Sequence, residues 1–416
     1  MSTQESAQIE HTPASDATKS EASNLRSAFV TLYDAQDVTM MSGTGYNISQ
    51  SFLRAGLDLS FIGPLKRQIR PMNLAQHAIN RFALRKNDHP QRDPAFLKNY
   101  SRQVEAQLKG LDVDVVFGSG GLPVSYIETD LPLVIWTDCT FANLLEYYSK
   151  YSNLSKRTIR DGHAADRNLY QRCTRAIFAS SWAAESAIND YGLAREHATI
   201  VSRGANVPGS KSEADIEALI DARPSDKCIL HLVGVDWTRK GGQIAAGAAQ
   251  ELIKRGIPTE LRVVGVEPAF EGAIPDFVKP LGRISKSTPE GMKRFTDLLG
   301  ESHFLIVPTR AEAYGIVYLE ASAYGVPSLA TRTGGVPSAV KDGINGILFD
   351  LNDPASRYAD AIEKLWNDHD AYRALAMSAF RDHQERTNWT VVAQQAISVL
   401  KSASQSTNNQ QTTQST

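Results

Sequence analysis

Short apolar runs that alternate with helical patterns are the feature that most constrains the fold of this chain. In the first half, runs rich in β-branched and aromatic residues occupy 28–32, 59–62, 113–117, 133–136, 176–179 and 199–201. Helical patterns lie between them, at 47–55, 74–84, 95–108, 158–172 and 182–191. Apolar runs without polar alternation are typical of strands buried on both faces, and strands separated by helices predict a parallel sheet of βαβ units.

The same alternation restarts after a break at 206–226, a polar and charged segment that we interpret as a linker. Beyond it, apolar runs and helical patterns alternate again, at 229–233, 242–254, 261–264, 303–307, 315–324, 328–330, 356–366 and 371–382. A chain of 416 residues is also too long for one compact core. The sequence therefore predicts two doubly wound α/β domains, which bind ligands at the carboxyl ends of their strands.

Both ends of the chain are predicted to be disordered tails. Residues 1–24 are polar, and residues 402–416 are almost entirely Ser, Gln, Thr and Asn. The first tail lacks the apolar segment of a signal peptide, and the chain has no run of 18 apolar residues that could cross a membrane. We therefore expect a cytoplasmic protein.

Charge and cysteine usage argue against several classes of function. The formal net charge is −2, so nucleic-acid binding is not expected. Cys139, Cys173 and Cys228 have no CxxC spacing, and the nine histidines show no HExxH pattern. Neither a disulfide framework nor a zinc site is predicted.

Glu312 and Glu320 mark the most informative segment. Glu312 precedes a predicted helix start near Gly315, and Glu320 lies about two turns inside. Eight helical residues span about 12 Å, whereas the two acids of a glycosidase lie roughly 5–9.5 Å apart. The spacing better suits hydrogen bonds to two parts of one long ligand, such as a sugar and a ribose. The alternative is a favourable charge at a helix N-terminus for Glu312 and a solvated helix face for Glu320.

This pair resembles the E-x7-E element of the GT4 family of retaining glycosyltransferases, which have the GT-B fold. The likeness extends to further segments in the same order: Pro308-Thr309, 321–327, Gly334-Gly335 and 342–346. It implies that Glu312 binds hydroxyls of the transferred sugar and supports positive charge at its anomeric carbon. Glu320 would hold the ribose, and the amides near Tyr314 and Gly315 would face the diphosphate or the sugar.

The resemblance also implies a domain organisation. Residues 25–207 would form an acceptor-side Rossmann-like domain, and 208–386 a second one that binds the nucleotide sugar across a cleft. A C-terminal helix at 387–401 would cross back to the first domain. The GT-B fold is not expected to need a catalytic metal, so Asp112-Val113-Asp114 is interpreted as structural. No cofactor is expected beyond the nucleotide sugar, which is a co-substrate.

Arg239 and Lys240 follow a predicted strand and open a helix. Two cations there would neutralise a leaving diphosphate, although a solvated loop carries such a pair equally well. Lys240 matches the lysine of the family. The family commonly has an arginine where this chain has Val235, so either one diphosphate contact is missing or Arg239 replaces it.

Two segments of the first half are further candidates. Gly43, Thr44 and Gly45 resemble the family's glycine loop, which approaches the donor phosphates, although a plain turn would look alike. Ile48 stands where a dinucleotide fingerprint has its third glycine. Asp138 follows a predicted strand near the place of a family histidine. It either bonds a sugar hydroxyl or orients the acceptor, or it caps the next helix.

Residues 66–92 contain seven Lys or Arg residues and one acid. This segment is either a surface that contacts a membrane at its inner face or an acidic acceptor, or it is a solvated helix face.

We expect a retaining glycosyltransferase that moves a sugar from a nucleotide-sugar donor to an unidentified acceptor. The alternatives are another GT-B-type enzyme, such as a sugar-nucleotide epimerase or an inverting transferase, and a non-catalytic nucleotide-sugar-binding or scaffold subunit. Val235 favours the last, as does Ser338 where the family often has Glu. The donor base, the sugar, the acceptor and the oligomeric state stay open.

Overall fold

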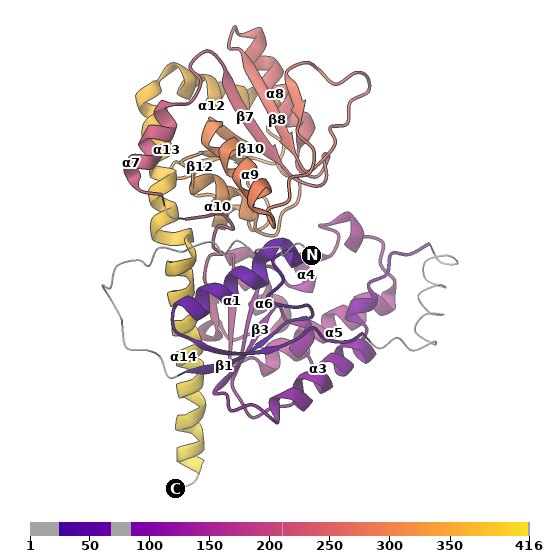
Figure 1. The fold of residues 1–416 in the computed structure, drawn as a ribbon. Coiled ribbons are helices and arrows are strands. Elements are labelled where there is room, and N and C mark those ends of the chain that lie inside the picture. Colours follow the sequence, from indigo (N-terminus) through magenta and orange to yellow (C-terminus); the bar gives the residue numbers. More distant parts are fainter. Residues whose placement is uncertain (1–24, 68–84, 210, 415–416) are drawn as a thin grey trace, which may run out of the picture.

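The computed structural model describes residues 25–67, 85–209 and 211–414, which form two α/β domains (Figure 1). The sheet of the first domain has the order β2-β1-β3-β4-β5-β6, with every pair parallel. Its strands are β1 (Arg26–Val30), β2 (Asp58–Ile62), β3 (Val115–Ser119), β4 (Leu133–Thr137), β5 (Arg175–Phe178) and β6 (Ala198–Ile200). Its helices are α1 (Thr44–Arg54), α3 (Pro94–Leu108), α4 (Phe141–Leu144), α5 (Lys156–Arg172) and α6 (Ser181–Tyr191).

The second domain repeats this plan with the strand order β12-β11-β10-β7-β8-β9, again all parallel. Its strands are β7 (Cys228–Val233), β8 (Thr259–Val264), β9 (Val278–Pro280), β10 (Phe304–Val307), β11 (Ser328–Thr331) and β12 (Gly346–Phe349). Its helices are α7 (Glu213–Asp221), α8 (Gly242–Lys254), α9 (Pro289–Glu301), α10 (Ile316–Ser322), α11 (Val336–Ala339), α12 (Ala355–Asn367) and α13 (His369–Asp382). The predicted pair of doubly wound α/β domains is confirmed.

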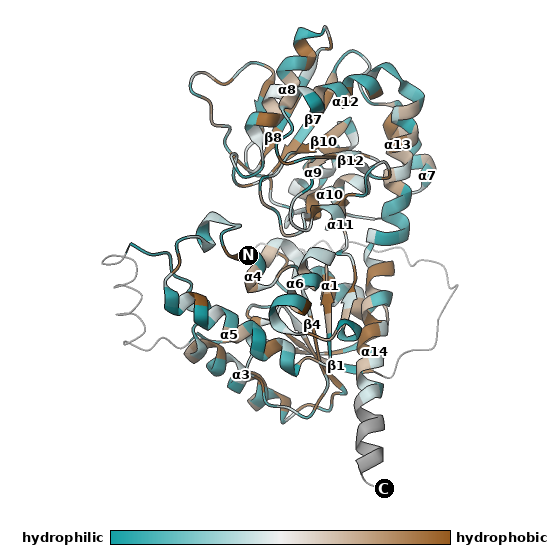
Figure 2. Ribbon diagram, turned by 180° about the vertical axis from the view of Figure 1, so that it is seen from behind, coloured by the Kyte–Doolittle hydropathy of each residue, from teal (hydrophilic) through white to brown (hydrophobic). Residues whose placement is uncertain are grey.

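Burial explains why the strands read as unbroken apolar runs. Every residue of β10 is buried, as are five of the six residues of β7. Figure 2 shows the hydrophobic strands inside each domain and hydrophilic residues on the outer faces of the helices. Because helices cover both faces of each sheet, neither face of a central strand needs polar residues.

The segment interpreted as a linker contains α7, so that interpretation is wrong for residues 213–221. Ser212 and Asp215 form a capping box at its start, and Ile216 and Ile220 are buried in the core of the second domain. The polar residues that suggested a linker belong to the exposed face of this amphipathic helix.

The chain returns to the first domain through helix α14 (Trp389–Gln414), which lies along α1 (Figure 1). Val392, Ala396 and Leu400 share a buried cluster with Phe29 and Phe117 of the first sheet. The prediction of a disordered tail is therefore wrong for residues 402–414. A helix anchored by packing continues through residues of moderate helix propensity, because each added residue gains one hydrogen bond without a new nucleation step.

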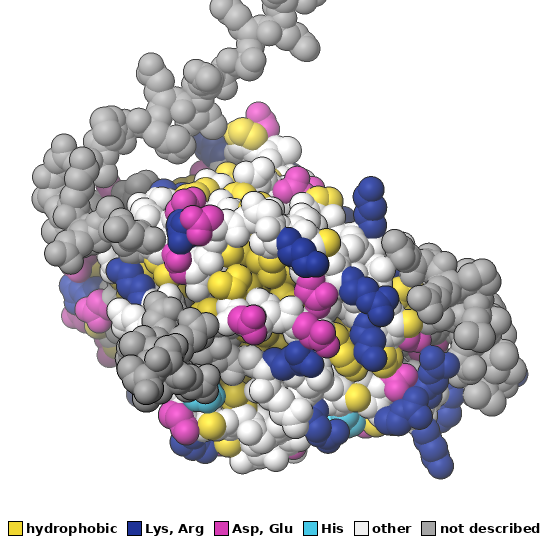
Figure 3. Space-filling view, turned by 90° about the horizontal axis from the view of Figure 1, so that it is seen from below, with side chains coloured by type: hydrophobic (Ala, Val, Ile, Leu, Met, Phe, Trp, Pro, Cys, Tyr) yellow, Lys and Arg dark blue, Asp and Glu magenta, His cyan; other side chains and the backbone are white. Residues whose placement is uncertain are grey.

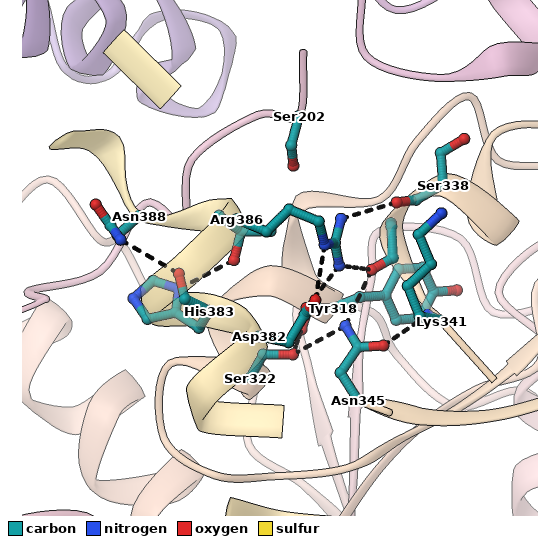
Figure 4. A network of polar contacts seen from close by, with 12 residues as sticks. Ser202, Tyr318, Ser322, Ser338, Lys341, Asn345, Asp382, His383, Arg386 and Asn388 are labelled. Atoms are coloured by element: carbon teal, nitrogen blue, oxygen red, sulfur yellow. Dashed lines mark hydrogen bonds and ion pairs between the residues drawn. The ribbon is translucent and has the colours of Figure 1, made fainter. Parts of the chain in front are cut away.

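One turn of π-helix, His383–Thr387, joins α13 to α14. Arg386 of this turn donates to the carbonyl oxygens of Ser338 at 2.9 Å and of Ala339 at 3.0 Å, and pairs with Asp382 at 2.6 Å (Figure 4). The crossing between the domains is thus bonded to α11 of the second domain.

The structure tests the interpretation of the DxD-like segment 112–114, whereas other sequence interpretations fall on residues that it does not describe. Arg26 pairs with both Asp112 and Asp114, so the DxD-like segment has a structural role. Residues 1–24 and 68–84 lie outside the described residues, and with them the helical pattern at 74–84 and most of the basic segment 66–92. No described helix is long and apolar enough to cross a membrane.

Candidate functional site

The site lies where the strand order of the second sheet reverses. Counted from β7, its order is 3-2-1-4-5-6, and the reversal falls between β7 and β10. The loops after these two strands leave in opposite directions, so they line a crevice at the carboxyl end of the sheet. Arg239 and Lys240 follow β7, and Glu312 follows β10.

The two loops are bonded to each other. The Arg310 amide donates to the Arg239 carbonyl at 2.7 Å, and the Thr309 hydroxyl donates to the same oxygen at 3.0 Å. Gly241 has a φ of +75°, and an added Cβ there would lie 2.1 Å from the Pro308 carbonyl oxygen. Glycine is therefore required for the loops to approach this closely.

Glu312 lies between the two cations. Its Oε2 atom is 2.5 Å from Lys240 Nζ and 3.3 Å from Arg239 Nη1, and the Glu312 and Lys240 side chains are only 14% and 10% exposed. Burial alone would raise the pKa of Glu312. The Lys240 ammonium and the Arg239 guanidinium outweigh it and lower the pKa below its ordinary value of 4.5. The carboxylate is therefore ionised at neutral pH.

Glu320 lies inside α10 and its side chain is 3% exposed, so the alternative of a solvated helix face is wrong. It pairs with Lys286, which lies between β9 and α9 and packs over the Phe295 ring. The sequence analysis did not single out Lys286, because nothing in the local pattern distinguishes it from other surface lysines.

Tyr314 and Gly315 precede α10. The amides of both residues have no hydrogen-bond partner among the residues that the structure describes. Gly315 has a φ of +94°, and an added Cβ would meet the Tyr318 ring at 2.4 Å. The Tyr314 hydroxyl lies 2.6 Å from Ser202 Oγ of the first domain. Their predicted role toward a ligand stays a prediction.

The glycine segment of the first domain begins α1. Gly43 has a φ of +75° and precedes Thr44, the first residue of this helix. An added Cβ at Gly45 would lie 2.6 Å from the Tyr33 hydroxyl oxygen. Asn206 donates to the carbonyl of Ser42 at 2.9 Å and accepts from Trp389 of α14 at 3.2 Å. The segment is therefore tied to the crossing between the domains.

Asp138 follows β4 but does not cap the next helix, because Thr140 and Asn143 form the capping box of α4. The capping alternative is therefore wrong. Asp138 pairs with Arg203 at 2.7 Å, and the guanidinium of Arg203 lies 4.5 Å from the Trp136 ring centre. Its carboxylate is 38% exposed, whereas Arg203 is buried.

Val235 and Ser338, where the family commonly has Arg and Glu, lie in different surroundings. Val235 is 79% exposed, so most of its side chain faces solvent. The hydroxyl of Ser338 accepts a hydrogen bond from the Ser181 amide of the first domain at 3.2 Å. Ser338 thus forms a contact between the domains.

In the described part of the basic segment 66–92, the basic side chains differ in burial. Arg92 is buried and pairs with Asp166 at 2.7 Å, and Lys86 donates to Asn153 at 2.6 Å. Seen from below, many Lys and Arg side chains gather toward one side of the first domain (Figure 3). Elsewhere on this face, acidic and basic side chains are interspersed. Arg92 is therefore part of the structure rather than of a binding surface.

Residues 227–368 match the family model described as Glycosyl transferases group 1. D-inositol 3-phosphate glycosyltransferase 1 of Catenulispora acidiphila is 28% identical over 264 residues, which are 58% of this chain and 60% of that protein. D-inositol 3-phosphate glycosyltransferase of Corynebacterium diphtheriae is 26% identical over 229 residues, 52% and 53% of the two chains. The match thus spans just over half the length of these relatives.

Solved structures share the whole architecture. Sucrose-phosphate synthase of Thermosynechococcus elongatus superposes with a TM-score of 0.65 at 17% identity, over 91% of this chain and 98% of that one. Anabaena HepE in complex with UDP and glucose gives 0.60 at 15% identity, over 91% and 100%. These likenesses confirm the predicted GT-B fold, and the family match confirms the predicted resemblance.

Proposed function

We propose that this chain, whose residues 227–368 match the family model described as Glycosyl transferases group 1, transfers a sugar from a nucleotide-sugar donor to an acceptor bound by the first domain. The observation that supports this most directly is the convergence of Arg239 and Lys240 on Glu312 at the reversal point of the second sheet. A fixed carboxylate beside two fixed cations suits a reaction that creates positive charge at a sugar carbon and negative charge on a leaving diphosphate.

The two cations would stabilise the departing diphosphate. In the free protein Glu312 balances only one of their two positive charges, so a diphosphate would share or take over these contacts. Arg239 also donates to the Ala311 carbonyl at 3.0 Å, which holds its guanidinium in place for a ligand. With Val235 exposed nearby in sequence, Arg239 would supply the contact that the family's arginine makes.

Glu312 would contact the transferred sugar. Because its lowered pKa keeps it ionised, it would support positive charge at the anomeric carbon as the bond to the diphosphate breaks. Retention follows in our proposal if the acceptor attacks from the face that the diphosphate leaves. The leaving phosphate then takes the acceptor proton, so no separate protein base is needed.

Glu320 would hold the ribose of the donor. For this, Lys286 would release the Glu320 carboxylate or share it with the ribose hydroxyls. The named relatives act on D-inositol 3-phosphate, and HepE is solved with UDP and glucose. We therefore propose uridine diphosphate sugars as the first donors and inositol phosphates as the first acceptors to test. Asp138, with Arg203 behind it, would contact the acceptor.

Calorimetry against nucleoside diphosphates, followed by product analysis with sugar nucleotides, tests this function. A ligand that binds only the folded state also raises the melting temperature. Lys240→Ala is expected to weaken diphosphate binding, and Glu312→Gln to lower kcat while donor affinity changes little. Turnover should survive EDTA, since no metal is part of the proposal. A wild-type protein that binds no nucleoside diphosphate would contradict it.

The rival function is a subunit that binds a nucleotide sugar without turnover, and the exposed Val235 favours it because one expected cation is absent. Donor binding with no transfer to any acceptor, and no hydrolysis of the donor, would support this rival.

A peripheral membrane contact through residues 66–92 would be an addition to either function. Flotation with anionic liposomes at low salt tests it, and Arg85→Ser with Lys86→Ser should reduce any binding.

A further inference from the structure

Two adjacent tyrosines of the first domain bind the backbone of the loop that carries Glu312. The Tyr148 hydroxyl accepts a hydrogen bond from the Ala313 amide at 2.7 Å. The Tyr147 hydroxyl accepts one from the Glu312 amide at 2.9 Å, and lies 2.9 Å from the Thr333 hydroxyl and 3.3 Å from the Glu312 carbonyl oxygen. Both residues come from the segment after α4, so these bonds join the two domains directly.

Contacts within the first domain restrain both tyrosines. The amides of Tyr147 and Tyr148 each donate to the Leu144 carbonyl at 3.3 Å, and α4 itself starts with a capping box. The Tyr147 ring packs against Trp182 of α6, with 5.0 Å between the ring centres. Because their own domain restrains these side chains, little conformational entropy is lost when they bind the opposite loop.

The second domain is shaped to receive the Tyr147 hydroxyl. Gly334 has a φ of +52°, and an added Cβ there would lie 2.3 Å from this hydroxyl oxygen and 2.3 Å from the Glu312 carbonyl oxygen. An added Cβ at Gly335 would lie 1.9 Å from the Ala313 carbonyl oxygen. The two glycines therefore leave room both for the loop and for the tyrosine. This fit is independent of the hydrogen bonds themselves.

Tyr148 also lies beside the charged cluster, with its ring centre 5.7 Å from the guanidinium carbon of Arg239. Burial, followed by the nearby Glu312 carboxylate, raises the pKa of Tyr148, so its hydroxyl keeps its proton at neutral pH. The two hydroxyls bind the amides of Glu312 and Ala313 and leave those of Tyr314 and Gly315 without a partner in the described structure. One part of the loop is fixed by the first domain, and the next part is free for a ligand.

We propose that Tyr147 and Tyr148 are positioning residues, which fix Glu312 against a bound donor only when the two domains are in contact. This role rests on the proposed function. When the domains separate, the amides of Glu312 and Ala313 lose their acceptors and the loop gains freedom, so a donor can enter. When they close, the loop is fixed and the Glu312 carboxylate is held in place for the reaction.

Removing only the hydroxyls tests the role. Tyr147→Phe and Tyr148→Phe keep the rings, and leave Lys240, Arg239 and Glu320 in place to bind the donor. We expect kcat to fall about tenfold for each variant and about a hundredfold for the pair, because a misplacement near 1 Å costs a rate factor of that order. The Kd of the donor should change less than about twofold, since it depends on groups that stay untouched.

Tyr126→Phe is the matched control, because Tyr126 is a half-buried tyrosine of the same domain whose hydroxyl has no hydrogen-bond partner among the described residues. Hydrogen exchange of peptides covering 309–316 gives a second readout that needs no turnover. Exchange should be faster in both test variants than in the wild type and the control.

The outcomes separate the two proposals. Faster exchange together with a lower kcat at unchanged donor Kd supports the positioning role. An unchanged kcat refutes it, as does a loss of donor affinity that accounts for the whole loss of activity, since the hydroxyls would then act through binding or folding. A wild type that turns over no donor refutes the proposed function and the positioning role together. An active wild type with unaffected variants refutes the positioning role alone.

Discussion

Replacing Lys240 with Met would remove the charge nearest to Glu312 and keep most of the side chain. The stem of Lys240 packs beside Gly234, where an added Cβ would lie 2.5 Å from Lys240 Cγ, so a methionine of similar length preserves the packing. At 2.5 Å, two unit charges attract by about 7 kcal/mol at an effective dielectric constant near 20. Desolvation of both groups offsets much of this attraction.

Removing one partner of a buried ion pair typically costs about 3–5 kcal/mol, because the other charge stays buried. Arg239 remains 3.3 Å from Glu312 and compensates in part. We therefore expect Lys240→Met to lower the free energy of unfolding of the second domain by about 2–3 kcal/mol. Glu312→Gln should also be destabilising, because it leaves two cations together. The double variant should lose less than the sum, with a coupling of about 2 kcal/mol.

Urea unfolding of the full chain, followed by pulsed hydrogen exchange of peptides from α8 and α10, would measure these differences in the second domain alone. The exposed pair Lys293 and Asp297, whose side chains are 77% and 51% exposed, is the matched control. Its coupling should not exceed about 0.5 kcal/mol. Additive effects of Lys240→Met and Glu312→Gln, within about 0.5 kcal/mol, would refute the inference that these two charges depend on each other.

The same pair predicts a dependence on pH with a definite sign. The pKa of Glu312 is lowered in the folded protein relative to an ordinary 4.5. Its contribution to stability is therefore fully present above pH 4.5 and is lost as the pH falls through the lower folded pKa. Stability measured from pH 6 down to pH 3 should fall less steeply in Glu312→Gln than in the wild type. Equal slopes would contradict the assignment.

Three further predictions concern other parts of the chain. Val235→Arg is expected to tighten nucleoside diphosphate binding about tenfold, because one charge-assisted hydrogen bond contributes about that much. If calorimetry shows no gain in affinity, the loop after β7 does not contact the diphosphate at position 235. His231 is buried and neither ring nitrogen has a hydrogen-bond partner among the described residues, and burial lowers its pKa from 6.5 to about 3. Its contribution to stability is thus lost as the pH falls from 6.5 toward 3, and His231→Leu should flatten the melting temperature over that range. Gly335→Ala would bring a Cβ within 1.9 Å of the Ala313 carbonyl oxygen, and should lower the free energy of unfolding by about 1–3 kcal/mol in a denaturation experiment. Gly110→Ala is the control: the nearest atom to its Cβ would lie at 3.9 Å, so the free energy of unfolding should change by less than about 0.5 kcal/mol.

The sequence alone determined the fold class and most of the candidate site. Hydrophobic periodicity is a local property, so the buried runs and helical patterns identify nearly all the central strands and the long helices. In a doubly wound domain, ligand-facing residues lie just after the strands, and this rule selects Arg239, Lys240 and Glu312 before their neighbours are known. Where the local signal was polar, as at 213–221 and 402–414, the prediction failed, because burial of one helix face or anchoring by preceding turns outweighs composition.

Only the tertiary structure decided which of these residues meet. The order of the second sheet places β10 beside β7, and this alone brings Glu312 to Lys240 across 72 positions of the chain. The contacts of Tyr147 with Glu312 and of Tyr148 with Ala313 each span 165 positions, and Lys286 reaches Glu320 from a loop with no motif of its own. The tyrosine contacts follow from how the two domains pack against each other, and the Lys240 and Lys286 contacts follow from how distant loops of the second domain meet. The hydrophobic periodicity of a segment does not predict these contacts, because it is the same whichever distant segment packs against it.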